Sequence, residues 1–134
     1  MLRLLSFLVI LGFAVPAAAQ EQSIEDVISS QLQAFNDRDV EAAWQYASPM
    51  IKGIFGTPDN FGMMVRNGYP MVWRPGDVQF LELREEQGLL IQKVMIQDQA
   101  GQFFVLDYQM IPNAAGDGWL INGVQIERAP QMGA

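Results

Sequence analysis

The 134-residue chain contains no cysteine and no histidine. Without cysteine it can form no disulfide, so packing alone must hold the fold together, even in an oxidising compartment. Without either residue type, a Ser-His-Asp or Cys-His nucleophilic centre is impossible. A zinc site of the usual kind is excluded for the same reason. Any catalysis would have to rely on carboxylates, tyrosine, lysine or serine.

Basic residues are scarce as well. The chain has 8 Lys and Arg against 15 Asp and Glu, which gives a formal net charge of −7. A surface with this charge repels phosphate backbones and anionic lipid headgroups. Because the few basic residues form no cluster along the chain, we expect no nucleic acid among the partners.

A long apolar run occurs only at the N-terminus. A positively charged start (residues 1–3) and an apolar run (residues 4–15) precede Pro16 and three alanines. This pattern is typical of a secretory signal peptide, with cleavage between Ala19 and Gln20. The alternative is an uncleaved membrane anchor, but the run is shorter than the roughly 18–20 residues that span a bilayer. We therefore expect a periplasmic or secreted protein with no stable membrane insertion after cleavage.

Removal of residues 1–19 leaves 134 − 19 = 115 residues. This length predicts one small domain, large enough to bury a single core without disulfides. We expect the domain to span residues 20–128. Residues 129–134 contain proline and glycine without a hydrophobic pattern, and we expect them to form a disordered tail.

Apolar residues at helical spacing predict four short helices over residues 23–68. Ser23 is the predicted N-cap of the first helix, and Asp39 that of the second. Ser48 and Thr57 are each followed by proline, which predicts an N-cap and the first helical position of the third and fourth helices.

The sequence also predicts the positions of polar residues on the first helix and in the turn after it. Gln31 is predicted to lie on the polar side, away from the apolar stripe. Asp37 and Arg38 could belong to a charged site or to a turn between two helices. Because Asp39 begins a new helical pattern and Glu41 suits its first turn, we favour a water-facing turn.

The periodicity changes after Tyr69 and Pro70. Strands are predicted over residues 78–86, 89–98, 102–111 and 119–128, separated by glycine-containing turns. Such short connections indicate antiparallel hairpins. Residues 71–74 are a candidate for a further short strand. The predicted fold class is α+β, with N-terminal helices packed in a curved antiparallel sheet of four or slightly more strands.

The order of these motifs resembles a known superfamily. A helix ending in AF is followed by a DRD turn, by YASP, by PDNFGMMV and by a closing GDGWLINGVQI strand. Over residues 23–127 the chain resembles the nuclear transport factor 2-like superfamily, and within it the bacterial domain of unknown function 4864 family. The resemblance implies a cone, in which a strongly curved sheet wraps around the first helices and leaves a cavity at its open end. It implies no particular activity, because the superfamily includes isomerases, dehydratases, transport factors and protein-binding domains.

Asp107 is the carboxylate of most interest, because its strand is otherwise apolar and aromatic. Inside a cone, burial would raise its pKa and let it act as a general base. Tyr46, Tyr69 and Trp119 are candidate neighbours in such a ligand site. Members resembling steroid isomerases use an acidic residue with a tyrosine, so the resemblance implies an isomerase or lyase as an alternative function. We favour the other placement, on the solvated face or bonded to a neighbouring strand.

Methionine is a candidate metal ligand, but it has a simpler explanation. Met63, Met64 and Met71 form the densest methionine group and could hold Cu(I) through their thioethers. Methionine also fills irregular cores, and with no histidine or cysteine in the chain we predict no metal and no cofactor. In the last strand, Gly123 predicts a β-bulge or the close approach of another backbone.

These observations favour an exported, non-catalytic domain that binds a small apolar ligand or a protein partner. The alternative is a small isomerase or lyase that uses a cavity carboxylate and tyrosine. A buried carboxylate within hydrogen-bond reach of a buried tyrosine would favour the enzyme. An apolar interior would favour binding.

Two predicted strands are apolar on both faces, at residues 89–91 and 103–106. An antiparallel sheet covered on one side should instead alternate apolar and polar residues. An exposed apolar patch usually marks an interface, and superfamily members often dimerise through the outer sheet face. We therefore expect a two-fold homodimer centred on the second and third strands, with Lys93 and Gln97 at its rim.

Overall fold

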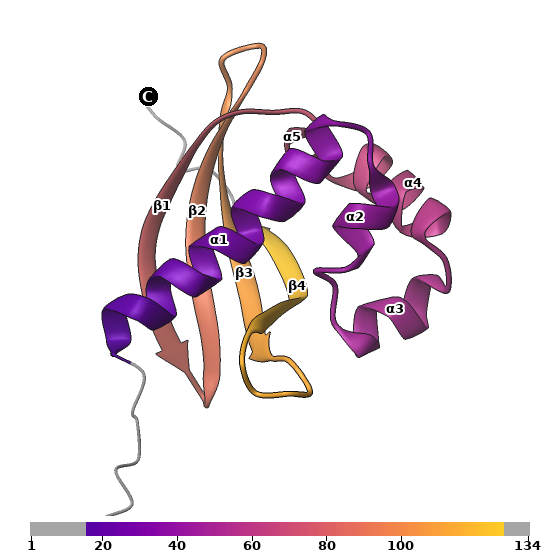
Figure 1. Ribbon diagram of the computed structural model, residues 1–134. Coiled ribbons are helices and arrows are strands. Elements are labelled where there is room, and N and C mark those ends of the chain that lie inside the picture. The colour runs from indigo at the N-terminus through magenta and orange to yellow at the C-terminus, as the bar shows by residue number, and fades with distance from the viewer. Residues whose placement is uncertain (1–15, 128–134) are drawn as a thin grey trace, which may run out of the picture.

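The computed structural model describes residues 16–127. The predicted tail and most of the predicted signal peptide lie outside this range. Helices come first along the described chain and strands follow (Figure 1). The elements are α1 (Ala17–Asn36), α2 (Val40–Trp44), α3 (Pro49–Phe55), α4 (Pro58–Gly68), α5 (Pro70–Trp73), β1 (Pro75–Glu86), β2 (Leu89–Asp98), β3 (Phe103–Pro112) and β4 (Trp119–Glu127).

The predicted α+β class and the antiparallel sheet are confirmed. The four strands pair in the order β1-β2-β3-β4, and each neighbouring pair is antiparallel. The sheet is open, so β1 and β4 are its edges. The segment between α2 and α3 lies along the β4 edge, where Ala47 makes a parallel bridge with Ile121. This contact fixes the smaller helices beside the last strand.

The core lies between α1 and one face of the sheet, here called the inner face, which α1 crosses (Figure 1). The apolar stripe predicted for the first helix is buried there, since its side chains recur at the three- and four-residue spacing of one helix face. Residues of α1 in the core include Ile24, Ile28, Leu32, Ala34 and Phe35, and those of the sheet include Val94, Ile96, Leu106, Tyr108 and Met110.

Most of the predicted helix caps are confirmed. The side chains of Asp39, Ser48 and Thr57 each accept a hydrogen bond of 3.0–3.2 Å from the backbone N–H three residues further on. Each bond satisfies a backbone donor that the first helical turn leaves free. These local bonds fix where α2, α3 and α4 begin.

The prediction for Ser23 is wrong. α1 begins at Ala17, and the Ser23 hydroxyl donates to the carbonyl of Ala19 at 2.9 Å. A serine inside a helix commonly bonds the carbonyl four residues earlier. The alanines before it have the highest helix propensity of any residue, so the helix continues upstream of the residue that resembled a cap.

The short strand predicted at residues 71–74 is also wrong. Residues Pro70–Trp73 form the single helical turn α5, with Pro70 at its first position. The fixed φ of proline suits the start of a helix. Met71 and Val72 are adjacent and both buried, which a strand facing one core could not achieve because its side chains alternate.

The turn between α1 and α2 is confirmed, but Arg38 makes specific contacts although it is exposed. Its φ is 62°, and its Nη1 donates to the carbonyls of Phe35 at 3.0 Å and Trp73 at 2.8 Å. The guanidinium carbon lies 4.6 Å from the centroid of the Trp73 ring, within the range of a cation–π contact. Arg38 therefore ties the end of α1 to α5.

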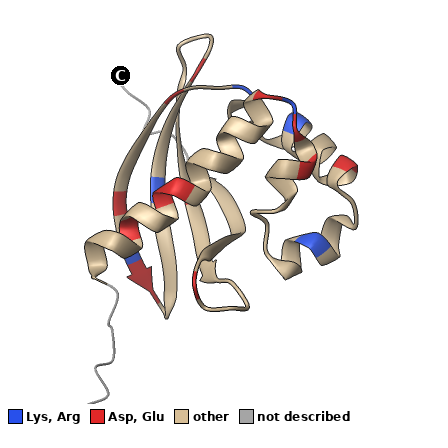
Figure 2. Ribbon diagram, in the orientation of Figure 1, with Lys and Arg blue, Asp and Glu red and all other residues tan. Residues whose placement is uncertain are grey.

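Lys and Arg are dispersed along the described part of the chain (Figure 2). Figure 2 shows Lys and Arg as isolated positions on the ribbon, separated by acidic and uncharged residues. Within residues 16–127, no helix combines the length and the apolarity needed to cross a membrane.

Candidate functional site

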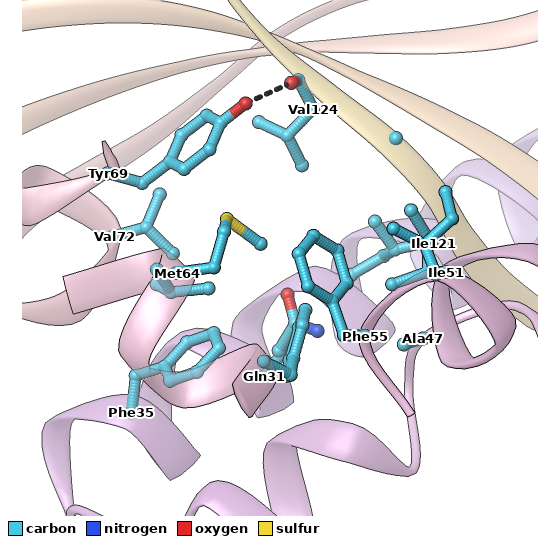
Figure 3. Close-up of a pocket in the computed structure, with 14 residues that line it drawn as sticks. Gln31, Phe35, Ala47, Ile51, Phe55, Met64, Tyr69, Val72, Ile121 and Val124 are labelled. Atoms are coloured by element: carbon cyan, nitrogen blue, oxygen red, sulfur yellow. Dashed lines mark hydrogen bonds between the residues drawn. The ribbon is translucent and has the colours of Figure 1, made fainter. Parts of the chain in front are cut away.

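A cavity of about 230 Å³ lies between the helices and β4 (Figure 3). α1, α3, α4, α5 and β4 all contribute to its wall. The lining residues are Gln31, Phe35, Ala47, Ile51, Ile54, Phe55, Phe61, Met64, Val65, Tyr69, Val72, Ile121, Gly123 and Val124. None of these side chains carries a charge, and only Gln31 and Tyr69 carry a hydrogen-bonding group.

A bulge in β4 shapes the strand wall of the cavity. Gln109 pairs with Gly123, but the next residue of β3, Met110, pairs with Ile121. Asn122 is the extra residue, which confirms the bulge predicted from Gly123. Because of this insertion, Ile121 and Val124 both face the helices although they lie an odd number of residues apart.

Tilted aromatic contacts fix the helical wall. The rings of Phe35 and Phe61 have centroids 5.7 Å apart, and those of Phe55 and Phe61 lie 6.0 Å apart. These separations are in the favourable range for edge-to-face pairs. They connect α1, α3 and α4, so three helices hold one continuous apolar wall.

The cavity is reached past α3. None of the seven residues of this helix is buried, although Ile51, Ile54 and Phe55 line the cavity. The Ile54 side chain is 65% exposed. It therefore lies at the mouth, with one side toward the cavity and the other toward solvent.

Gln31 and Tyr69 place two polar groups in this apolar wall. Gln31 is only 3% exposed, and its Nε2 donates to the carbonyl of Ala43 at 3.1 Å. The Tyr69 hydroxyl donates to the carbonyl of Val124 at 3.0 Å (Figure 3). Both side chains are thus held in place by backbone carbonyls of other elements.

The structure does not bring the four predicted site residues together. Tyr69 lines the cavity. Tyr46 is half-buried and lines a shallow groove between α1 and α2 instead. Trp119 begins β4 and packs against the core without lining the cavity.

Asp107 lies on the outer face of the sheet, the face opposite α1, as in the placement favoured from the sequence. Its carboxylate accepts two hydrogen bonds from Arg84, of 3.2 and 3.1 Å. Burial alone would raise the pKa of Asp107, but the hydrogen bonds and charge of Arg84, with the charge of Lys93, hold it below its ordinary value. The raised pKa expected for a cone interior is therefore absent, and the carboxylate is no general base for this cavity.

The outer face carries further ion pairs around Asp107. Lys93 lies 3.4 Å from Glu127 of β4 and 3.6 Å from Glu82 of β1. Lys93 and Asp107 are register partners on β2 and β3. The middle of this face is therefore charged.

Gln31 is a functional candidate that the sequence interpretation missed, since it was assigned to the polar side of the first helix. Gln31 follows Ile28 by three residues and precedes Phe35 by four, and both are fully buried. That spacing is the signal that could have placed it on the buried stripe. Within residues 16–127, no group of three or more acidic, histidine or cysteine side chains could hold a metal ion.

Most of the chain matches a protein family. A family described as Domain of unknown function (DUF4864) matches residues 17–134. Comparisons with curated proteins and with solved structures find no match. The family description assigns no activity, so the function has to be inferred from the cavity.

Proposed function

The chain belongs to the DUF4864 family of domains of unknown function, and from its cavity we propose that it binds a small apolar molecule without catalysing a reaction. The observation that carries this proposal is the lining of the cavity, whose fourteen residues include no charged side chain. An apolar ligand gains free energy in such a site in proportion to the surface that it removes from water.

The volume indicates the size of the ligand. The cavity measures about 230 Å³, which is more than the roughly 150 Å³ of an engineered apolar cavity that binds benzene. It is less than the roughly 300 Å³ at the lower end of drug-sized ligand pockets. A molecule with one substituted ring, or a short aliphatic chain, fits this range.

The alternative function, an isomerase or lyase, has less support. It requires a carboxylate within reach of a tyrosine in the same cavity. Tyr69 is present, but its hydroxyl is bonded to the Val124 carbonyl, and Asp107 is paired with Arg84 on the other face of the sheet. The described residues therefore favour binding over proton transfer.

Titration calorimetry with single-ring probes such as p-xylene tests the proposal. We expect the wild-type protein to bind p-xylene and the cavity-filling variant Val124→Phe to lose that binding. Ile126→Phe is the matched control, because Ile126 lies on the same strand, is 38% exposed and does not line the cavity. Absence of binding to the wild type, or equal binding to Val124→Phe, would contradict the proposal.

Export and the cone-shaped fold are further parts of the proposal. The predicted cleavage after Ala19 leaves the core intact, because the first buried residue of α1 is Ile24. An intact mass beginning at Gln20, measured on protein from the periplasmic fraction, would support export, and a membrane-bound mass that retains residues 1–19 would contradict it. A cavity between the first helices and the sheet agrees with the nuclear transport factor 2-like arrangement that the resemblance implies.

A further inference from the structure

The inference rests on the proposed apolar binding and concerns the polar group of the ligand. Gln31 lies at the base of the cavity among apolar side chains (Figure 3). Its amide orientation is fixed, because Nε2 donates to the Ala43 carbonyl at 3.1 Å. The other end of the amide, Oε1, then points toward the middle of the cavity (Figure 3). No hydrogen bond to this oxygen is found among the described residues.

The second polar group of the cavity, the hydroxyl of Tyr69, also offers an acceptor. The hydrogen of the Tyr69 hydroxyl is engaged by the Val124 carbonyl at 3.0 Å. What the Tyr69 oxygen still offers is lone pairs, which accept hydrogen bonds. The two side-chain oxygens that face the cavity, Oε1 of Gln31 and the hydroxyl oxygen of Tyr69, are therefore both acceptors, and the one side-chain donor left beside them is the second Nε2 hydrogen of Gln31.

The lack of charged residues in the cavity wall argues against an anionic ligand. No Lys or Arg lies among the fourteen lining residues, so a bound carboxylate or phosphate would have no counter-charge. Transfer of an unpaired anion into an apolar site is strongly unfavourable. An acceptor such as an ether or ketone oxygen would face Oε1, with no hydrogen between the two oxygens.

We propose that the ligand is a neutral single-ring or short-chain molecule carrying one O–H or N–H group, which donates to Oε1 of Gln31. Phenols, small cyclic alcohols and small heteroaromatic N–H compounds belong to this class. In this arrangement the apolar body fills the space between Phe55, Met64 and Val124, while the donor satisfies the otherwise free amide oxygen. A site with a buried acceptor discriminates against an analogue that lacks the donor.

Four probes of similar size separate the alternatives by calorimetry on the purified protein at neutral pH. They are p-cresol, which has a donor; 4-methylanisole, whose methylated oxygen only accepts; p-xylene, which has neither; and p-toluate, which is anionic. We expect p-cresol to bind about tenfold more tightly than 4-methylanisole, the ratio expected for a hydrogen bond worth about 1.4 kcal/mol. We expect no binding of p-toluate.

The variant Gln31→Met tests the residue itself, since it keeps the length of the side chain and removes the acceptor. We expect this variant to bind p-cresol and 4-methylanisole with about equal affinity, and still to bind p-xylene. If Gln31→Met does not fold, the wild-type probe series alone decides the question.

The outcomes separate this inference from the function on which it rests. Equal wild-type affinity for p-cresol, 4-methylanisole and p-xylene would overturn the donor preference and leave apolar binding intact. Binding of p-toluate, or a preference for p-cresol that persists in Gln31→Met, would also overturn it. Failure of all four probes to bind would overturn both proposals.

Discussion

At the scale of single residues, Tyr108 carries a buried hydroxyl that makes no hydrogen bond within the described residues. It is fully buried on the inner face of β3. An unsatisfied buried hydroxyl destabilises the folded state by about 1–3 kcal/mol. We expect Tyr108→Phe to raise the free energy of unfolding at neutral pH by about 1 kcal/mol, measured by urea denaturation.

The same residue predicts a dependence on alkaline pH. Burial raises the pKa of Tyr108 above the value of about 10 that tyrosine has in an unfolded chain. As the pH rises above that value, the unfolded chain releases a proton that the folded chain retains, so wild-type stability falls. The advantage of Tyr108→Phe should therefore grow from neutral pH to about pH 10.5. Tyr46→Phe, at a half-buried position, is the control. A less stable Tyr108→Phe would show that the hydroxyl has a partner in solution.

For Asp107 we expect a loss of stability at acidic pH, in contrast to the alkaline loss expected for Tyr108. Its lowered pKa means that the carboxylate stabilises the fold above the unfolded value of about 3.9, and that this contribution is lost as the pH falls through the folded value. With side chains 14% and 28% exposed, the pair with Arg84 is worth about 1 kcal/mol after solvent screening. We expect Asp107→Asn to lower stability by that amount at neutral pH and by less below about pH 4.

Urea denaturation at two pH values, with Arg84→Gln and the double variant, measures this contribution. The two single changes should be non-additive, since either one removes the same ion pair. A more stable Asp107→Asn at neutral pH would instead indicate an uncompensated buried charge.

At the scale of elements, the contact between α2 and α4 depends on Gly62. A Cβ added at Gly62 would lie 2.7 Å from Cγ1 of Val40, closer than carbon atoms can approach without moving. We expect Gly62→Ala to lower the free energy of unfolding by about 1–3 kcal/mol through overpacking. Combination with Val40→Ala should restore part of the loss. Thermal or urea unfolding of the single and double variants measures both effects.

Gly53 on α3 is the matched control for this change. A Cβ at that position would meet no atom within 4 Å, and alanine has a higher helix propensity than glycine by about 1 kcal/mol. Gly53→Ala should therefore leave stability unchanged or raise it. Equal destabilisation by both substitutions would show that the contact with Val40 does not cause the destabilisation by Gly62→Ala.

Local signals predicted most elements of this fold. Asp39, Ser48 and Thr57 cap helices as predicted, because a cap depends only on the next few residues. The strands were predicted from the turn signals that separate them, which are also local. α5 was missed because its burial depends on contacts with the rest of the core. Local pattern alone cannot distinguish a short apolar helix from a short strand.

The candidate site was less predictable than the fold. Tyr69 was predicted, but the cavity itself is made by five separate elements whose meeting no local pattern reports. Gln31 was missed because a glutamine is more often exposed than buried, and its partner Ala43 lies on a different helix. The cap residues could be predicted from their neighbours in sequence, whereas the position of Gln31 depends on the packing of α2 on α1.

At the scale of the whole molecule, the outer face of the sheet differs from the face predicted for a dimer. Exposed apolar side chains are present, with Phe103 55% and Leu89 39% exposed. Lys93, however, bridges toward Glu82 and Glu127 in the middle of that face. A dimer centred on β2 and β3 would therefore bury Lys93, which the sequence had placed at the rim.

We still expect the homodimer, because exposed large apolar residues on one sheet face usually mark an interface, and because charges that stay paired with one another cost less to bury than unpaired charges. Phe103, at the start of β3, is the most exposed large apolar side chain of the described sheet. Phe103→Glu should therefore shift the mass measured by light scattering at micromolar concentration from dimer toward monomer. Met63→Glu is the control, since Met63 is 62% exposed on α4, away from the sheet, and should leave the dimer unchanged. A monomeric wild type across this concentration range would contradict the prediction, and the exposed side chain of Phe103 would then need a different partner to explain it.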